Sequence, residues 1–156
     1  MPTSTYVALQ TTTLSASASS VTFSSIPSGY RDLILVMNGT GQNAILLLRF
    51  NGDSGSNYSA VRMYGTGSTT GSTSGTDTGI QYGYVPTAGA QNRYQIFDYS
   101  ATDKHKSVLA HRSEWSGGIV AIAGRWANTD AITSIEVYSA NNLDSGHTLS
   151  LYGIEA

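Results

Sequence analysis

Residues 33–37 read Leu33-Ile34-Leu35-Val36-Met37, an apolar run that lies between Arg31-Asp32 and Asn38-Gly39. The run is too short for a buried helix, and turn-forming residues bound it. These features predict a β-strand. Its apolar side chains do not alternate with polar ones, so both faces of the strand are expected to be covered. The run at residues 45–48 has the same character.

Short runs of β-branched and aromatic residues, bounded by Gly, Ser, Asn or Asp, recur along the whole chain. No window carries an apolar stripe at helical spacing, and Ser, Thr, Val, Tyr and Gly are poor helix formers. We therefore predict strands near residues 6–9, 21–23, 33–37, 45–48, 58–64, 80–85, 93–99, 107–111, 119–123, 132–138 and 147–154. The fold class predicted is all-β: a single antiparallel β-sandwich, jelly-roll-like, of about ten strands.

The chain of 156 residues is predicted to form one domain over residues 1–156. Two segments are too polar to belong to a core. The N-terminal segment, about residues 1–20, is predicted to be an arm or an edge segment. Residues 65–79 contain five glycines and no apolar residue, which predicts a flexible Gly/Ser/Thr loop.

The composition excludes several function classes. The chain has 8 Lys+Arg against 10 Asp+Glu, a formal charge of -2, and no cysteine. This charge gives no basic footprint for nucleic acid or an anionic membrane surface, and the absence of cysteine excludes disulfides and thiol chemistry. No signal peptide and no apolar segment of membrane-spanning length is present. We expect synthesis in a cytoplasm, with no membrane or nucleic-acid partner.

The sequence does not favour catalysis. Its three histidines, His105, His111 and His147, have no third ligand at metal-site spacing, and no G-x-S-x-G motif is present. We predict that the protein is not an enzyme and has no cofactor or metal. Residues 51–57 place oxygen-bearing side chains at alternate positions, as in a calcium loop, but the twelfth position is Arg62 rather than Glu. A hairpin connection is favoured, and calcium stays an alternative.

Two sets of residues are candidates for contacts with partners. The strands predicted at residues 33–37 and 45–48 are apolar on both faces. If a neighbouring subunit covers their second face, the interface contains Leu33, Leu35, Met37, Ile45 and Leu47. Loops or the N-terminal segment are the alternative cover. Four aromatic residues could contact a partner protein or stack on glycans, the alternative being ordinary packing within sheets: Trp115, Trp126, Tyr82 and Tyr84.

Four stretches of the sequence carry a family resemblance: residues 49–59, 98–106, 123–134 and the closing 149–154, which ends Leu-Tyr-Gly-Ile. Together they resemble a group of small virion proteins of tailed bacteriophages. Members of this group are capsid decoration (cement) proteins or tail-fibre and receptor-binding modules. The resemblance covers nearly the whole chain and brings no catalytic residues with it.

The resemblance implies a non-enzymatic structural protein of the virion. The expected role is that of a homotrimeric β-sandwich at the capsid surface, which contacts the major capsid protein and bridges capsomers of the mature head. The alternative is a tail-fibre or receptor-binding module that recognises host surface glycans through exposed aromatic residues.

Overall fold

The computed structural model describes residues 5–39, 45–84, 90–113 and 118–155; of residues 82–84 and 90 it describes only the backbone. Among these residues the chain forms strands and no helix. The twelve strands are β1 (Tyr6–Thr13), β2 (Ala18–Phe23), β3 (Asp32–Gly39), β4 (Ile45–Phe50), β5 (Tyr58–Gly65), β6 (Thr70–Asp77), β7 (Ile80–Tyr84), β8 (Ala90–Phe97), β9 (Lys106–Ser113), β10 (Ile119–Trp126), β11 (Ile135–Leu143) and β12 (Thr148–Ile154).

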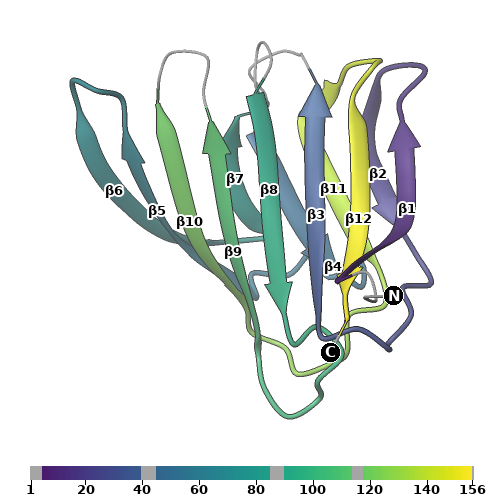
Figure 1. Ribbon diagram of the computed structural model, residues 1–156. Helices are drawn as coiled ribbons and strands as arrows, with labels where there is room; N and C mark the ends of the chain where they lie inside the picture. The colour runs from purple at the N-terminus through teal and green to yellow at the C-terminus, as the bar shows by residue number, and fades with distance from the viewer. Residues whose placement is uncertain (1–4, 40–44, 85–89, 114–117, 156) are drawn as a thin grey trace.

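The strands form two antiparallel sheets that pack face to face (Figure 1). The large sheet has the order β1-β12-β3-β8-β9-β10-β5-β6, and the small sheet has the order β2-β11-β4-β7. The chain changes sheet repeatedly along its length, as in a jelly roll. The predicted all-β antiparallel sandwich is therefore confirmed, with twelve strands where about ten were expected.

The core lies between the two sheets and is built by alternation along the strands. Strand β9 shows the pattern most clearly, because buried and exposed side chains alternate over all eight of its residues. In β3 the inward side chains Leu33, Leu35 and Met37 are fully buried. They face a small sheet whose own inward residues include Leu46 and Leu48 of β4.

The correction to the predicted secondary structure concerns residues 65–79. The prediction of a loop throughout this segment is wrong, because residues 70–77 form β6, the edge strand of the large sheet. Strand β6 pairs with β5 over eight consecutive residue pairs without a register shift. An edge strand of this kind is held by backbone hydrogen bonds, so it needs no apolar side chains.

The polar N-terminal segment also forms strands. Strand β1 is the other edge of the large sheet, where it pairs with β12, and β2 lies at an edge of the small sheet. Tyr6 begins β1, and its hydroxyl accepts a 3.5 Å hydrogen bond from Arg93 of β8. Because β12 and β3 lie between these two strands, the contact spans the outer side of β3. Ile34 there is only 2% exposed, so the chain itself covers the second face of β3.

Candidate functional site

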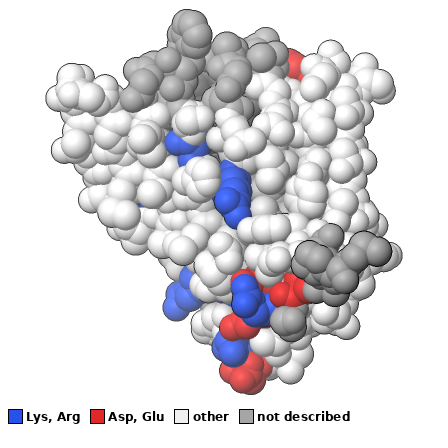
Figure 2. Space-filling view, viewed as in Figure 1, with Lys and Arg blue, Asp and Glu red and all other residues white. Residues whose placement is uncertain are grey.

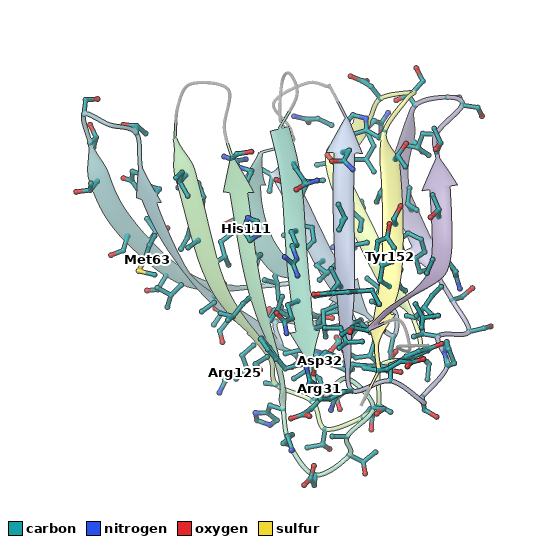
Figure 3. All side chains as sticks on the ribbon, viewed as in Figure 1. Arg31, Asp32, Met63, His111, Arg125 and Tyr152 are labelled. Atoms are coloured by element: carbon teal, nitrogen blue, oxygen red, sulfur yellow. The ribbon has the colours of Figure 1, made fainter. Side chains whose placement is uncertain are left out.

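The outer face of the large sheet, which points away from the small sheet, carries side chains in regular cross-strand rows. The strand register aligns positions from seven strands in each row. One row contains Tyr152, Ile34, Gln95, Leu109, Ala123, Val61 and Ser74. The adjacent row contains Ser150, Val36, Arg93, His111, Ala121, Met63 and Ser72. Figure 3 shows labelled members of these rows on both sides of the sheet's centre.

An aliphatic patch occupies the half of the outer face that β9, β10 and β5 form. We define this patch as Val61, Met63, Leu109, Ile119, Ala121 and Ala123. Its four large side chains are 47%, 56%, 53% and 68% exposed for Val61, Met63, Leu109 and Ile119. A depression of about 360 Å³ lies over part of the patch and extends to Arg93 and His111. Contiguous exposed apolar surface of this kind marks a site of contact with other molecules.

Charged groups are sparse at the centre of the outer face. Arg93 and His111 are cross-strand partners there. Figure 2 shows a largely uncharged face with basic side chains near its middle, while side chains of both signs gather at its lower end. Asp32 lies at that lower end (Figure 3), where its carboxylate accepts hydrogen bonds from Gln95 Nε2 and the Asp98 backbone N–H.

A second depression of about 450 Å³ lies on the other half of the outer face. Its floor and walls combine aliphatic, aromatic and polar side chains from β1, β3, β8 and β12. We call it the Arg93 pocket, and its residues are Tyr6, Ile34, Val36, Gln91, Arg93 and Tyr152.

The predicted subunit-interface residues separate into two groups. For Leu33, Leu35 and Met37 the prediction is wrong, because these side chains fill the core between the sheets and present nothing to a neighbour. Ile45 is 41% exposed and Leu47 is half-buried. Both stay predictions for an interface on the outer side of the small sheet.

Trp126 is not a surface contact, so its prediction as a capsid or glycan contact is wrong. The side chain is completely buried at the end of β10. Its ring lies 5.5 Å from that of Phe50 and stacks on Tyr58 at 6.3 Å, measured between ring centroids. Its Nε1 donates a 2.7 Å hydrogen bond to Asp53 Oδ2. Tyr58 is buried as well, and burial raises its pKa to about 12.

The loop at residues 51–57 joins the two sheets, so the predicted hairpin is wrong: β4 belongs to the small sheet and β5 to the large one. Asn51 and Gly52 do adopt left-handed backbone conformations, with φ of 53° and 71°. Asp53 accepts hydrogen bonds from Trp126, Asn57 Nδ2 and the Gly55 N–H. Desolvation raises the pKa of Asp53, but these hydrogen bonds outweigh it and lower the pKa overall. The carboxylate that calcium would need is therefore occupied by donors.

The remaining predicted contact residues lie where side chains are not described. Trp115 lies outside the described residues. Tyr82 and Tyr84 belong to β7, whose backbone is described there but not these side chains. Their predicted roles stay predictions.

The histidines are dispersed. His147 is buried, with its Nδ1 2.8 Å from Asp144 O, whereas His111 lies on the outer face of the large sheet. Within the described ranges no three His, Asp or Glu side chains group as metal ligands. In that same part of the chain, no helix has the length and apolar character needed to cross a membrane.

The aliphatic patch and Arg93 were not singled out from the sequence. Residues 119–126 do carry an alternating pattern. Every second residue from Val120 to Trp126 is buried, and the residues between them are exposed or half-buried. That alternation places Trp126 on the same side as Val120 and Ile122, inside the sandwich.

Comparisons with known proteins place the chain in no family. No protein-family model matches the sequence, and no curated protein matches it. Among solved structures, the chain is similar to galectin LEC-6 of Caenorhabditis elegans, with 10% identity, a TM-score of 0.41, and coverage of 94% of this chain and 96% of the galectin. It is also similar to an exo-inulinase of Aspergillus awamori, with 12% identity, a TM-score of 0.33, and coverage of 97% of this chain and 29% of the inulinase.

A third similar structure is the alginate lyase Aly36B in complex with an alginate tetrasaccharide. The identity is 10% and the TM-score 0.29, with coverage of 93% of this chain and 80% of the lyase. At these values the similarities carry no argument about activity. The fold described above rests on the strand pairing of this chain itself.

Proposed function

We propose that the chain is a non-enzymatic structural protein of a tailed-phage virion, a homotrimeric decoration protein that contacts the major capsid protein and bridges capsomers. The observation that carries the proposal is the aliphatic patch on the outer face of the large sheet. The family resemblance in the sequence supports the choice of a phage capsid as the assembly.

The size of the outer face suits a stable protein contact. Eight strands about 4.8 Å apart, each about 25 Å long, give a face of roughly 1,000 Å². A standard protein–protein interface buries about 800 Å² per partner. A contact over the patch half of this face, extended onto neighbouring loops or strands, reaches that size.

The patch also has the chemistry of an assembly surface. Its large side chains are about half exposed, so their complete burial contributes about 1 kcal/mol each and about 4 kcal/mol per subunit. The six patch residues are uncharged, and Arg93 is the one charged side chain that lines the depression over them, so docking strips few ions of water. Three subunits acting together turn a moderate contact into strong binding to the shell.

The experiment is reconstitution on heads that lack this protein. Purified protein is mixed with such heads, and co-sedimentation is measured for the wild type, Leu109→Glu and Ser15→Glu. Ser15 is exposed between β1 and β2, so its variant adds the same charge away from both the patch and the predicted interface residues Ile45 and Leu47. We expect binding by the wild type and Ser15→Glu, and at least tenfold weaker binding by Leu109→Glu.

Two results would overturn the proposal. Failure of the wild-type protein to bind heads rejects the decoration role. Equal binding by Leu109→Glu and Ser15→Glu, with both proteins folded, rejects the aliphatic patch as the contact. Sedimentation velocity on the same three proteins measures the trimer directly.

A further inference from the structure

The Arg93 pocket is a second site on the outer face, and it differs in chemistry from the aliphatic patch. Its volume of about 450 Å³ falls within the range of about 300–1,000 Å³ that is usual for small-ligand sites. Ile34 and Val36 of β3 form its apolar part. Tyr6 and Tyr152 add aromatic rings that remain accessible, Tyr6 being 50% exposed.

Arg93 is the cation of this pocket. In the described part of the chain it forms no ion pair, and its side-chain hydrogen bond is the long 3.5 Å contact from Nη2 to the Tyr6 hydroxyl. By contrast, Arg49 and Lys104 each contact a carboxylate. No acidic side chain lines the pocket. A guanidinium in this setting favours an anionic ligand, and its planar fork matches a carboxylate.

The polar and aromatic groups favour a sugar as the carrier of that carboxylate. Tyrosine rings offer apolar faces for the C–H side of a sugar ring. The Tyr6 hydroxyl accepts from Arg93 and can still donate to a water or a ligand. Gln91, whose Nε2 donates to Asn38 Oδ1 at 3.1 Å, supplies an amide oxygen for a sugar hydroxyl.

An acidic peptide suits the pocket less well. Strands β3, β8 and β12, which carry most of the pocket, are each paired with neighbours on both sides. Their backbone groups are therefore engaged within the sheet and cannot pair with an added peptide strand. A sugar needs no backbone partner.

We propose that the Arg93 pocket binds a uronic-acid unit of a glycan. In this site the carboxylate contacts the Arg93 guanidinium, the sugar ring packs on Tyr152 or Tyr6, and hydroxyls bond to Gln91. The pocket adjoins the aliphatic patch, because Arg93 also lines the depression over that patch. The four large patch residues, Val61, Met63, Leu109 and Ile119, do not line the Arg93 pocket itself. A decoration protein with such a site would bind acidic polysaccharide at the virion surface.

The test is calorimetric titration of the full chain with tetragalacturonate, with neutral galactotetraose and with a Glu-rich peptide of equal charge. Arg93→Gln removes the cation, and Arg93→Lys keeps the charge without the planar fork. Arg125→Gln is the matched control, because Arg125 is an exposed arginine on the outer face of β10. Thermal melting verifies that every variant is folded.

We expect tetragalacturonate to bind the wild type and Arg125→Gln within a factor of two of each other. Arg93→Gln should bind at least tenfold more weakly, with Arg93→Lys intermediate, and added salt should weaken binding. The inference is overturned if the neutral sugar binds equally well or if Arg93→Gln matches Arg125→Gln. It is also overturned if the peptide alone shows binding that depends on Arg93. Ile119→Glu changes the aliphatic patch at a residue that lines neither depression, so it should leave uronate binding unchanged and keeps this outcome separable from that of the head-binding test.

Discussion

The hydrogen bond between Trp126 and Asp53 joins β10 to the loop between the two sheets, and its energy can be measured by a double-mutant cycle. Trp126→Phe keeps an aromatic ring in the core but removes the Nε1 donor, which lies 2.7 Å from Asp53 Oδ2. A hydrogen bond to a charged group contributes about 1.5–3 kcal/mol, and the lower value applies here because Asp53 is half-exposed. The smaller ring also leaves a void in a fully buried site. We expect Trp126→Phe to lower the free energy of unfolding by about 2–4 kcal/mol.

The cycle isolates the hydrogen bond from the void. Asp53→Asn keeps the shape of the side chain and removes its charge. Because the amide oxygen can still accept, the coupling measures the part of the hydrogen bond that depends on the carboxylate charge. At pH 7 we expect the single and double variants to give a coupling energy of about 1–1.5 kcal/mol in urea denaturation. As a control, Asp53→Asn combined with Met63→Ala on the outer face should give a coupling near zero.

The pH dependence follows from the direction of the pKa shift. The pKa of Asp53 is lower in the folded protein than its ordinary value of 3.8, as a net result of desolvation, which raises it, and three hydrogen bonds, which lower it more. This carboxylate therefore contributes stability above pH 3.8, and the contribution is lost as the pH falls through the lower folded-state pKa. A coupling below about 0.3–0.5 kcal/mol at pH 7 would refute the reasoning. So would a coupling that is unchanged at a pH below the folded-state pKa.

Two further predictions concern the packing of the sandwich and its buried tyrosines. Gly124→Ala should lower the free energy of unfolding by about 1–3 kcal/mol, because its Cβ would lie 2.7 Å from Cγ2 and 2.9 Å from Cδ1 of Ile80. An Ile80→Val background removes Cδ1 and should restore part of the loss. Equal stability of Gly124→Ala and wild type in chemical denaturation would contradict this packing. Alkaline pH should also destabilise the fold. Burial raises the pKa of Tyr58 to about 12 and raises that of Tyr94 as well, so stability is complete below pH 10 and declines as the pH rises through 12. Melting temperatures between pH 8 and pH 12 should fall less steeply in Tyr58→Phe, and equal slopes would reject the assignment.

Local patterns were sufficient to predict most strands. Runs such as Leu33 to Met37 carry both β propensity and clear boundaries, and these properties do not depend on distant parts of the chain. Strand β6 escaped prediction because Thr70–Asp77 has no apolar residue. Its position is fixed by backbone pairing with β5. Backbone pairing does not require apolar side chains, so hydrophobicity along the sequence does not predict it.

Which face of a strand is covered depends on contacts far apart in sequence. The outer side of β3 was expected to need a neighbouring subunit, a loop or the N-terminal segment. In the structure Ile34 is buried, and Tyr6 and Arg93 form a hydrogen bond on this side of β3 although they lie 87 positions apart in the sequence. No local pattern in the sequence reports such a contact.

The aliphatic patch could not be predicted from the sequence, for a physical reason. In β5, β9 and β10, apolar residues occupy both alternating sets of positions, so periodicity alone does not separate core from surface. Leu109 and Met63 become exposed only because the strand register aligns them on the outer face. Trp126 was predicted to be a contact residue on its type alone, and its inward position follows from the same register.

The proposed contact between the aliphatic patch and a capsid is most directly tested by cryo-electron microscopy of the phage particles in which the proposal places this chain. The proposal predicts trimers of the sandwich on the head, with Val61, Met63 and Leu109 buried against another protein subunit. Density for the chain in the tail, or on the head with this patch facing solvent, would contradict it.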